Sequence, residues 1–173
     1  LNYLPYSKHL HILFAFPNTY YSNLEAKGRL TNMESVTKEV KLMMDPPADP
    51  FAAPAEGAEE PQRFGAKDAT DLTWKNLLDS YSCTECGRCT SSCPANVTGK
   101  MLSPRKIMMD TRDRIEEIGN NVRKHGKDHD DGKSLLGDYI TEEEIWACTS
   151  CNACVQECPV TVSYTHLRAH ETQ

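Results

Sequence analysis

All eight cysteines of this 173-residue chain fall into two copies of one pattern, C-x2-C-x2-C-x3-C-P. The second copy lies 65 residues after the first and repeats its intervals without change. Disulfide frameworks scatter their cysteines, whereas four closely spaced thiols followed by proline are typical of metal-cluster ligands. The spacing therefore favours metal binding over four disulfides. The two runs are Cys83, Cys86, Cys89 and Cys93, and Cys148, Cys151, Cys154 and Cys158.

Each run has the chemistry of a [4Fe-4S] ligand set. Every iron of such a cluster takes one protein thiolate beside its sulfides, and C-x2-C-x2-C can wrap three corners while its amides face the sulfurs. Zinc also favours C-x2-C pairs, but it takes four ligands from two pairs, and the two runs exceed that need. We predict two [4Fe-4S] clusters, with a structural zinc-binding adaptor as an alternative.

The residue after the second cysteine of each run is Gly87 in one and Asn152 in the other. Glycine and asparagine are the residues that most readily adopt positive φ. A chain that wraps tightly around a cluster needs such a turn, so we expect the two residues to occupy equivalent places in the loops, with positive φ at one or both. The alternative is chance, since both residues are common in loops.

Composition limits the other possibilities. A net charge of −6 gives no general case for a basic face, so we expect no nucleic-acid partner. No stretch approaches the roughly 20 apolar residues that cross a bilayer. The chain begins with Leu1 rather than methionine, and we expect a fragment whose upstream part is missing. With no signal peptide in view, a reducing cytosol suits the thiolates.

Residues 1–24 are unusually aromatic, since six of the thirteen aromatic residues lie in the first 21 positions. Such density resembles a membrane-interface belt. We expect this segment to be the membrane-proximal end of a missing transmembrane helix, and the alternative is a buried aromatic element of an ordinary domain.

Residues 25–69 should connect this segment to the folded unit. Within them, residues 31–44 predict a short amphipathic helix with Val36, Val40 and Met43 or Met44 at helical spacing. The following stretch, DPPADPFAAPAEGAEEPQR, is rich in proline, alanine and acids and should be a linker.

Residues 70–160 should form an all-α domain, because no alternating apolar pattern of useful length is present. We predict a helix capped by Asp71 that leads to Cys83, a helix from Ser103-Pro104 to about Arg123, and a capping box of Thr141 with Glu144. An Asp110–Arg114 surface pair and a polar loop at 124–133 are also expected. The inward positions predicted for the first two helices are Leu72, Trp74, Leu77, Leu78 and Tyr81, and Ile107, Thr111, Ile115, Ile118 and Val122.

The segments CTECGRCTSSCPANVTGKMLSPRKI and IWACTSCNACVQECPV resemble the helical dicluster domain found in an iron-sulfur subunit of heterodisulfide reductase. They are also similar to the iron-sulfur subunits of anaerobic glycerol-3-phosphate dehydrogenase and lactate-utilisation systems. The resemblance covers residues 70–160, about half the chain, and implies an α-helical ferredoxin fold. The cysteine-rich CCG module of many of these relatives is missing from this sequence.

The comparison with two-cluster ferredoxins further implies that the ligands cross over between the runs. In those proteins the fourth cysteine binds the other cluster, because the proline behind it turns the chain away from its own loop. One cluster would then take Cys83, Cys86, Cys89 and Cys158, and the other Cys148, Cys151, Cys154 and Cys93.

The N-terminal stretch PYSKHLHILFAFP resembles the cytoplasmic end of the last helix in the gamma-subunit family of respiratory nitrate reductase, a membrane cytochrome b. The resemblance implies that His11 could bind haem b, with Lys8 where an arginine is usual. The second haem ligand would lie upstream of Leu1. Solvated interface histidines are the alternative.

The C-terminal stretch VSYTHLRAHET resembles the in-frame translation of a transposon-end adapter used to prepare sequencing libraries. We therefore expect the native sequence to end near Val160 and residues 161–173 to be a non-native tail. His166 and His170 are accordingly not counted as metal ligands.

Together these features predict an electron relay at the cytoplasmic face of the cell membrane, with no catalytic site of its own in this fragment. It would pass electrons between a membrane quinone or cytochrome b and a soluble partner that carries a CCG module or a flavin. The alternative is a soluble iron-sulfur subunit of a flavin-dependent dehydrogenase.

Overall fold

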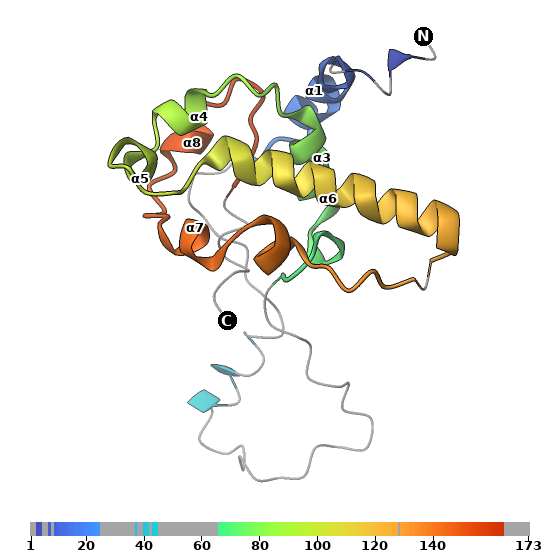
Figure 1. Cartoon of the computed structure of the whole chain (residues 1–173). Helices are drawn as coiled ribbons and strands as arrows, with labels where there is room; N and C mark the ends of the chain where they lie inside the picture. Colours follow the sequence, from blue (N-terminus) through green and yellow to red (C-terminus); the bar gives the residue numbers. More distant parts are fainter. Residues whose placement is uncertain are drawn as a thin grey trace.

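The computed structural model describes residues 9–24, 66–127 and 129–164, together with residues 3, 4, 7, 37, 40, 41, 43 and 44. The described residues form helices joined by loops, and no strand is present among them. Figure 1 shows the long helix α6 in the middle, with α4 and α8 on one side of it and α7 on the other. The predicted all-α class is confirmed.

Helix α6 (Pro104–His125) begins where the sequence predicted. The Ser103 hydroxyl accepts a hydrogen bond from the Lys106 amide at 3.4 Å, and Pro104 occupies the first turn. The predicted inward stripe is only partly correct. Thr111 is buried, but Met108 and Arg114 are buried as well, whereas the remaining predicted positions are half-buried, namely Ile107, Ile115, Ile118 and Val122.

The predicted Asp110–Arg114 pair is wrong. Arg114 is 3% exposed and instead contacts Asp68 at 2.7 Å and Asp131 at 2.6 Å, while Asp110 pairs with Lys106 at 2.9 Å. Two carboxylates that face both sides of the guanidinium make several charge-assisted hydrogen bonds, which a single surface carboxylate one turn away does not match.

Helix α3 (Trp74–Ser82) starts later than predicted, because Thr73 rather than Asp71 is its N-cap. Asp71 instead ends a short 3-10 helix, η2 (Ala69–Asp71), where it forms a capping box with Asp68. Trp74 was predicted to point inward but is 61% exposed. The buried residues of α3 are polar, and two of them bond toward helix α1, Asp79 through Lys75 and Ser82 directly. The buried set is Asn76, Asp79, Ser80 and Ser82.

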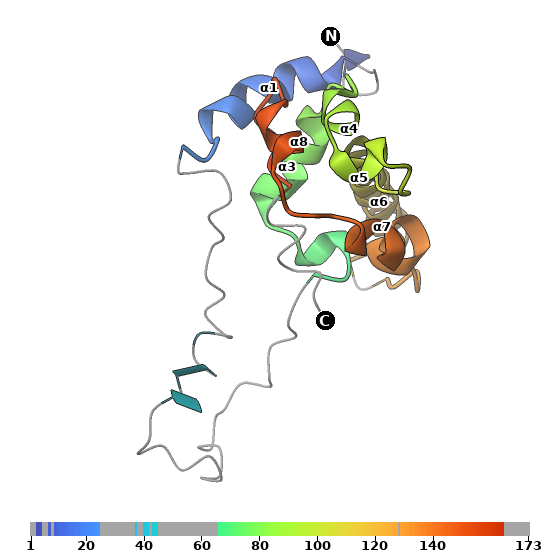
Figure 2. The same ribbon diagram turned by 90° about the vertical axis from the view of Figure 1, so that its left-hand side faces the viewer.

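Helix α1 (Leu10–Tyr20) packs along α3, as Figure 2 shows. The Ser82 hydroxyl donates to the Phe14 carbonyl at 3.2 Å, and the Lys75 ammonium donates to the Asn18 side chain at 2.7 Å. The rings of Phe14 and Tyr81 lie 5.9 Å apart. Among the helices that the structure describes, none is long and apolar enough to cross a membrane.

The C-terminal half brings the chain back to the start of the domain. The turn η3 (Leu135–Tyr139) is tied to the segment before η2, since the Leu136 amide donates to the Lys67 carbonyl at 3.1 Å. Helix α7 (Glu142–Trp146) follows and has the predicted capping box of Thr141 and Glu144. The remaining short helices are α4 (Arg88–Ser91), α5 (Pro94–Val97) and α8 (Ala153–Gln156).

Two predicted segments lie largely outside the described residues. Of the predicted helix at 31–44, residues 37, 40, 41, 43 and 44 are described and have helical backbone, and Val40, Met43 and Met44 are exposed. Residues 45–65, which include most of the predicted linker, and residues 165–173 are not described. Residues 161–164 are described, and Val162 and Tyr164 are 0% and 5% exposed.

Candidate iron-sulfur site

The two cysteine loops have the same backbone course. In the first loop, residues 83–89, Gly87 has φ 80°; in the second loop, residues 148–154, Asn152 has φ 60°. Each of these residues is the left-handed N-cap of the short helix that carries the third cysteine. The predicted pair of left-handed turns is confirmed.

Each loop contains a second left-handed residue that the sequence analysis missed. Glu85 and Ser150 both have φ 54° and immediately precede the second cysteine of their loops. At this position the Ser150 amide donates to the Cys148 sulfur at 3.5 Å, and the Glu85 amide makes the corresponding bond to Cys83. The sequence offered one signal for this residue, the identical cysteine spacing, because a positive φ found in one loop is expected at the same position of the other.

Cys158 lies among the thiols of the first loop. Burial raises the pKa of Cys83 to about 11, and the neighbouring charges of Cys89 and Cys158 raise it as well. Burial also raises the pKa of Cys158, with Cys89 and Cys86 as its charged neighbours. Cys158 also packs against the core cluster that holds Cys83 and Cys89, and these charge effects agree with that placement.

Cys93 lies beside the second loop rather than beside its own. It packs in a buried cluster with Ala95, Leu102 and Ala147, and Cys148 packs against this cluster. Cys154 belongs to the larger core cluster that also holds Cys83 and Cys89. The short helices α4 and α8, one from each run, are in direct contact. The fold thus intertwines the two runs.

The cysteines fit the chemistry of [4Fe-4S] ligation. All eight are thiols rather than disulfides, and in each loop the second cysteine is exposed while the third is buried. A cluster carries its thiolates on four different irons, so its ligands do not converge on one point as those of a single ion do. No three or more His, Cys, Asp or Glu side chains in the described part of the chain are arranged to hold one metal ion.

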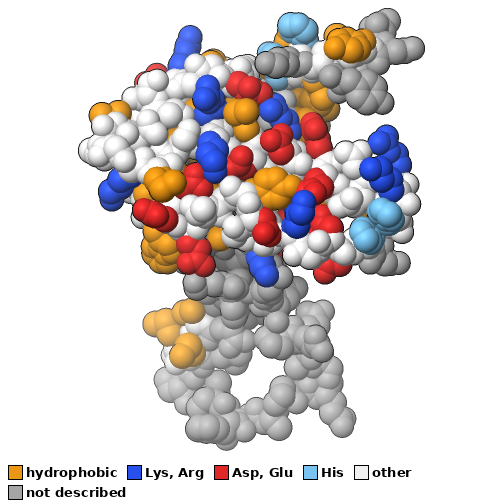
Figure 3. All heavy atoms as spheres, viewed as in Figure 1, with side chains coloured by type: hydrophobic (Ala, Val, Ile, Leu, Met, Phe, Trp, Pro, Cys, Tyr) orange, Lys and Arg blue, Asp and Glu red, His pale blue; other side chains and the backbone are white. Residues whose placement is uncertain are grey.

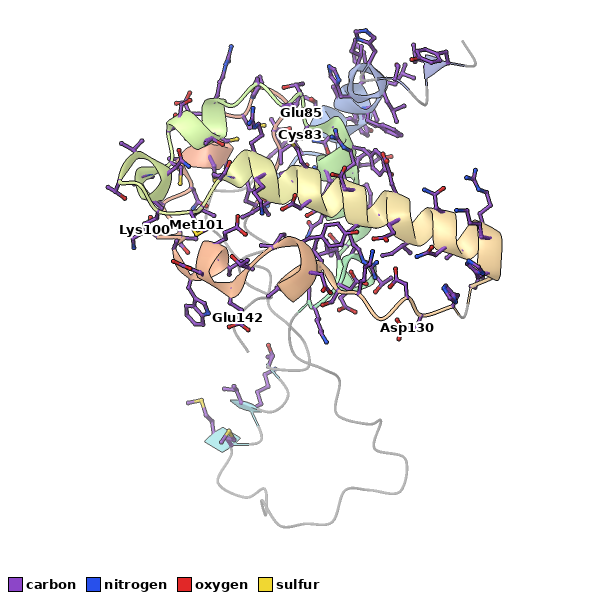
Figure 4. The ribbon with its side chains drawn as sticks, viewed as in Figure 1. Cys83, Glu85, Lys100, Met101, Asp130 and Glu142 are labelled. Carbon is purple, nitrogen blue, oxygen red and sulfur yellow. The ribbon has the colours of Figure 1, made fainter. Side chains whose placement is uncertain are left out.

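Charged residues flank the first loop. Glu85 pairs with Arg112 of α6 at 2.8 Å. The backbone hydrogen bond from Arg88, followed by the Thr84 hydroxyl and the charge of Arg88, lowers the pKa of Cys86 against the opposing effect of burial. Figure 4 shows Cys83 and Glu85 on one side of α6 and Glu142 on the other.

A buried polar group supports the helix that leads into the first loop. Asp79 is 0% exposed and binds Lys75 at 2.7 Å. Burial raises the pKa of Asp79 although its bonds to Lys75 and Asn18 act in the opposite direction. Periodicity could not predict this group, because α3 carries polar residues on the face that it buries.

His11, the candidate haem ligand, lies on α1 and lines a cavity of about 830 Å³ between α1, α3 and α6. Glu85 and Arg112 line the same cavity, so it reaches the first loop. Lys8, the other residue of this resemblance, lies outside the described residues.

Comparison with known proteins identifies the cysteine-rich part. The family described as "4Fe-4S dicluster domain" matches residues 82–162, so the chain contains such a domain. No solved structure matches the chain.

Several curated proteins are similar to the chain. A probable iron-sulfur-binding oxidoreductase, FadF, of Bacillus subtilis is 34% identical over 92% of the chain, which spans 24% of that protein. The EtfAB:quinone oxidoreductase of Syntrophomonas wolfei is 34% identical over 61% of the chain and 18% of its own length. A subunit of the ferredoxin/F420H2-dependent CoB-CoM heterodisulfide reductase of Methanosarcina acetivorans is 34% identical over 47% of the chain and 37% of its own length.

The similarity to these three proteins confirms the predicted relationship to heterodisulfide reductase and extends it to FadF-like iron-sulfur oxidoreductases. It supports iron-sulfur electron transfer as the function of the dicluster domain. The chain spans less than two fifths of each relative's length, so the activity of the whole protein is a matter for proposal.

Proposed function

From a 4Fe-4S dicluster domain whose two loops share one backbone, we propose that the chain relays electrons through two [4Fe-4S] clusters. One end of the relay would be a membrane quinone or cytochrome b, and the other a soluble partner with a CCG module or a flavin. The observation that carries the proposal is the placement of Cys158 among the first loop's thiols, with Cys93 packed beside the second.

This placement supports the ligand sets that the comparison with two-cluster ferredoxins implies. Cys83, Cys86, Cys89 and Cys158 would hold one cluster, and Cys148, Cys151, Cys154 and Cys93 the other. Each bound cluster supplies one-electron redox chemistry. The protein's part is to bury the third cysteine of each loop, to aim loop amides at the sulfurs and to fix the loops through their left-handed residues.

The exposed face of α1 supports a membrane location, which we propose to be the cytoplasmic face of the cell membrane. Ile12, Leu13, Phe16 and Tyr20 are 50%, 53%, 75% and 82% exposed, and residues 1–24 contain no acidic side chain. Aromatic and aliphatic side chains on one uncharged helix face suit the boundary between lipid headgroups and acyl chains. The name of the Syntrophomonas relative, a quinone oxidoreductase, is consistent with such a location.

Iron and acid-labile sulfide analysis of anaerobically purified protein tests the relay. We expect about eight irons and eight sulfides per chain and a brown colour that bleaches on reduction. A colourless protein with stoichiometric zinc, made in an iron-replete host, would instead support the adaptor alternative.

Flotation with phosphatidylcholine–phosphatidylglycerol vesicles tests the membrane face. The chain should float with vesicles, and the Phe16→Ser, Tyr20→Ser double variant should not. Val97→Ser is the matched control, because Val97 is 69% exposed but lies on α5 rather than α1. Equal flotation of all three proteins would contradict the proposal that α1 contacts the membrane.

The haem assignment of His11 remains a prediction. It requires the second ligand that we expect upstream of Leu1. The reduced optical spectrum of a full-length protein, with and without His11→Ala, tests it: loss of a haem b band in the variant is the expected result.

A further inference from the structure

The two proposed ligand sets are equally exposed. Each set contains two buried cysteines, one of intermediate exposure and one exposed. The reduction potential of an iron-sulfur cluster depends on cluster type, solvent exposure, hydrogen bonds to sulfur and net charge. Thiol exposure therefore gives no reason for two different potentials.

One loop hydrogen bond to sulfur is the same in both loops. Glu85 and Ser150 have the same φ, and each directs its amide at the first cysteine of its loop. The first set has further donors, the Val162 amide to Cys158 and the Tyr164 hydroxyl to Cys89. Those donors lie in the segment that we predict to be non-native, so they need a control of their own.

Net charge differs between the two loops. Arg88 follows Gly87 in the first loop, whereas Ala153 occupies the equivalent position of the second. A Cβ atom at Gly87 would lie 3.9 Å from the Arg105 guanidinium. The only acid within residues 83–89, Glu85, is paired with Arg112 at 2.8 Å. Two arginines beyond that pair thus lie at the first loop.

The helix that leads to the second loop is acidic. Helix α7, which ends two residues before Cys148, carries three consecutive glutamates, and Figure 3 shows acidic side chains gathered over this helix. Lys106 is shared between Glu144 and Asp110, both at 2.9 Å, so this group of three is net negative. Lys100, labelled in Figure 4, is a single cation on the loop between α5 and α6. Arg105 of α6 therefore lies at the first loop, whereas the next residue, Lys106, binds Glu144 of the helix that leads to the second loop.

We propose that Arg88 and Arg105 raise the reduction potential of the site formed by Cys83, Cys86, Cys89 and Cys158 above that of the other site. The inference rests on the proposed function, because it requires two clusters. Reduction adds one negative charge to a site, and a nearby cation stabilises that charge while a nearby carboxylate opposes it. The first electron added to the protein would therefore reduce the cluster at the first loop.

Potentiometric titration of the full chain, followed by electron paramagnetic resonance, tests this assignment. We expect two separate midpoint potentials. The Arg88→Gln, Arg105→Gln double variant should lower the higher potential and leave the other nearly unchanged, so that the gap narrows. Ala153→Arg should raise the lower potential and narrow the gap from the other side. High salt should reduce these shifts, because both arginines are exposed to solvent.

Two controls separate charge from structural damage. Arg88→Lys keeps the charge and should retain the wild-type potentials. Tyr164→Phe removes one of the two added sulfur donors, the hydroxyl that binds Cys89, and should leave the two potentials different. Fewer than two clusters by iron and sulfide analysis would overturn the proposed function and this inference with it. Two intact clusters with equal potentials would overturn this inference alone. So would a difference between the two potentials that stays the same in the arginine variants.

Discussion

The first and second loops show how one backbone can be built from different side chains. Gly87 and Asn152 occupy the same left-handed turn in the two loops, and Glu85 and Ser150 share a second positive φ. Glycine adopts that conformation without a Cβ penalty, whereas asparagine tolerates it better than most residues. The backbone is therefore constrained by the cysteine spacing, while side chains around it remain available for other roles.

The supports of the two loops differ more than the loops do. Helix α3 delivers the first loop and is held to α1 by Asp79, Lys75 and Asn18. The approach to the second loop is held by Arg114, which binds Asp131 at 2.6 Å and the Lys133 carbonyl at 2.7 Å and also holds Asp68. One support is thus a buried acid and the other a buried base.

The largest expected effect tests whether each loop depends on the other run. Cys93→Ala should remove the cluster of the second loop, and Cys158→Ala that of the first. Each variant should lose about half of the iron, because the fourth thiolate crosses over. Electron paramagnetic resonance would show which signal remains. Loss of the first loop's signal in Cys93→Ala would show instead that each run builds its own cluster.

The next largest expected effect is a loss of folding stability, which should differ between two arginines of α6. Arg114→Met should destabilise the protein by about 3 kcal/mol, because it removes a buried guanidinium and leaves two half-buried carboxylates without their partner. Arg112→Met is the matched control and should cost under about 1 kcal/mol, because the Arg112–Glu85 pair is partly exposed. Urea unfolding followed by circular dichroism measures both, and equal losses would contradict the distinct role of Arg114.

A smaller effect concerns the shared turn. Gly87→Val should cost about 1–2 kcal/mol, since it forces a β-branched residue into left-handed backbone. The exchange variants Gly87→Asn and Asn152→Gly should both be tolerated, because each residue already serves the equivalent position. Unfolding midpoints of the three variants measure this, and a severe loss in Gly87→Asn would mean that side-chain space, rather than φ, selects glycine.

The sequence predicted the features that depend on local chemistry. The cysteine repeat predicted the dicluster domain and both left-handed turns, and the signals at Ser103-Pro104 and at Thr141 and Glu144 predicted two helix starts. It failed where long-range contacts decide. Arg114 binds carboxylates 46 and 17 residues away, and Trp74 is exposed because α3 buries polar residues against α1. No apolar periodicity reports such contacts.

The smallest expected effect separates the two supports by their pH dependence. Burial raises the pKa of Asp79, whereas the hydrogen bond to Arg114 lowers that of Asp131. A carboxyl group with a raised pKa binds its proton more readily in the folded state, so its stabilising contribution is present at low pH and is lost as pH rises through the folded pKa. Asp131 behaves oppositely and stays ionised until the pH falls below its usual pKa of 3.8.

Unfolding of the cluster-loaded protein, followed from pH 8 downward toward the usual carboxyl pKa of 3.8, distinguishes these cases. Stability should rise as pH falls, by at most about 1.4 kcal/mol per pH unit for one proton. Asp79→Asn should reduce this rise and leave the part that comes from Asp110, whose pKa burial also raises, while Asp131→Asn should lower stability at every pH and keep the slope. A slope that persists undiminished in Asp79→Asn would assign the proton to another group, and the support of the first loop would then not be the acid-sensitive one.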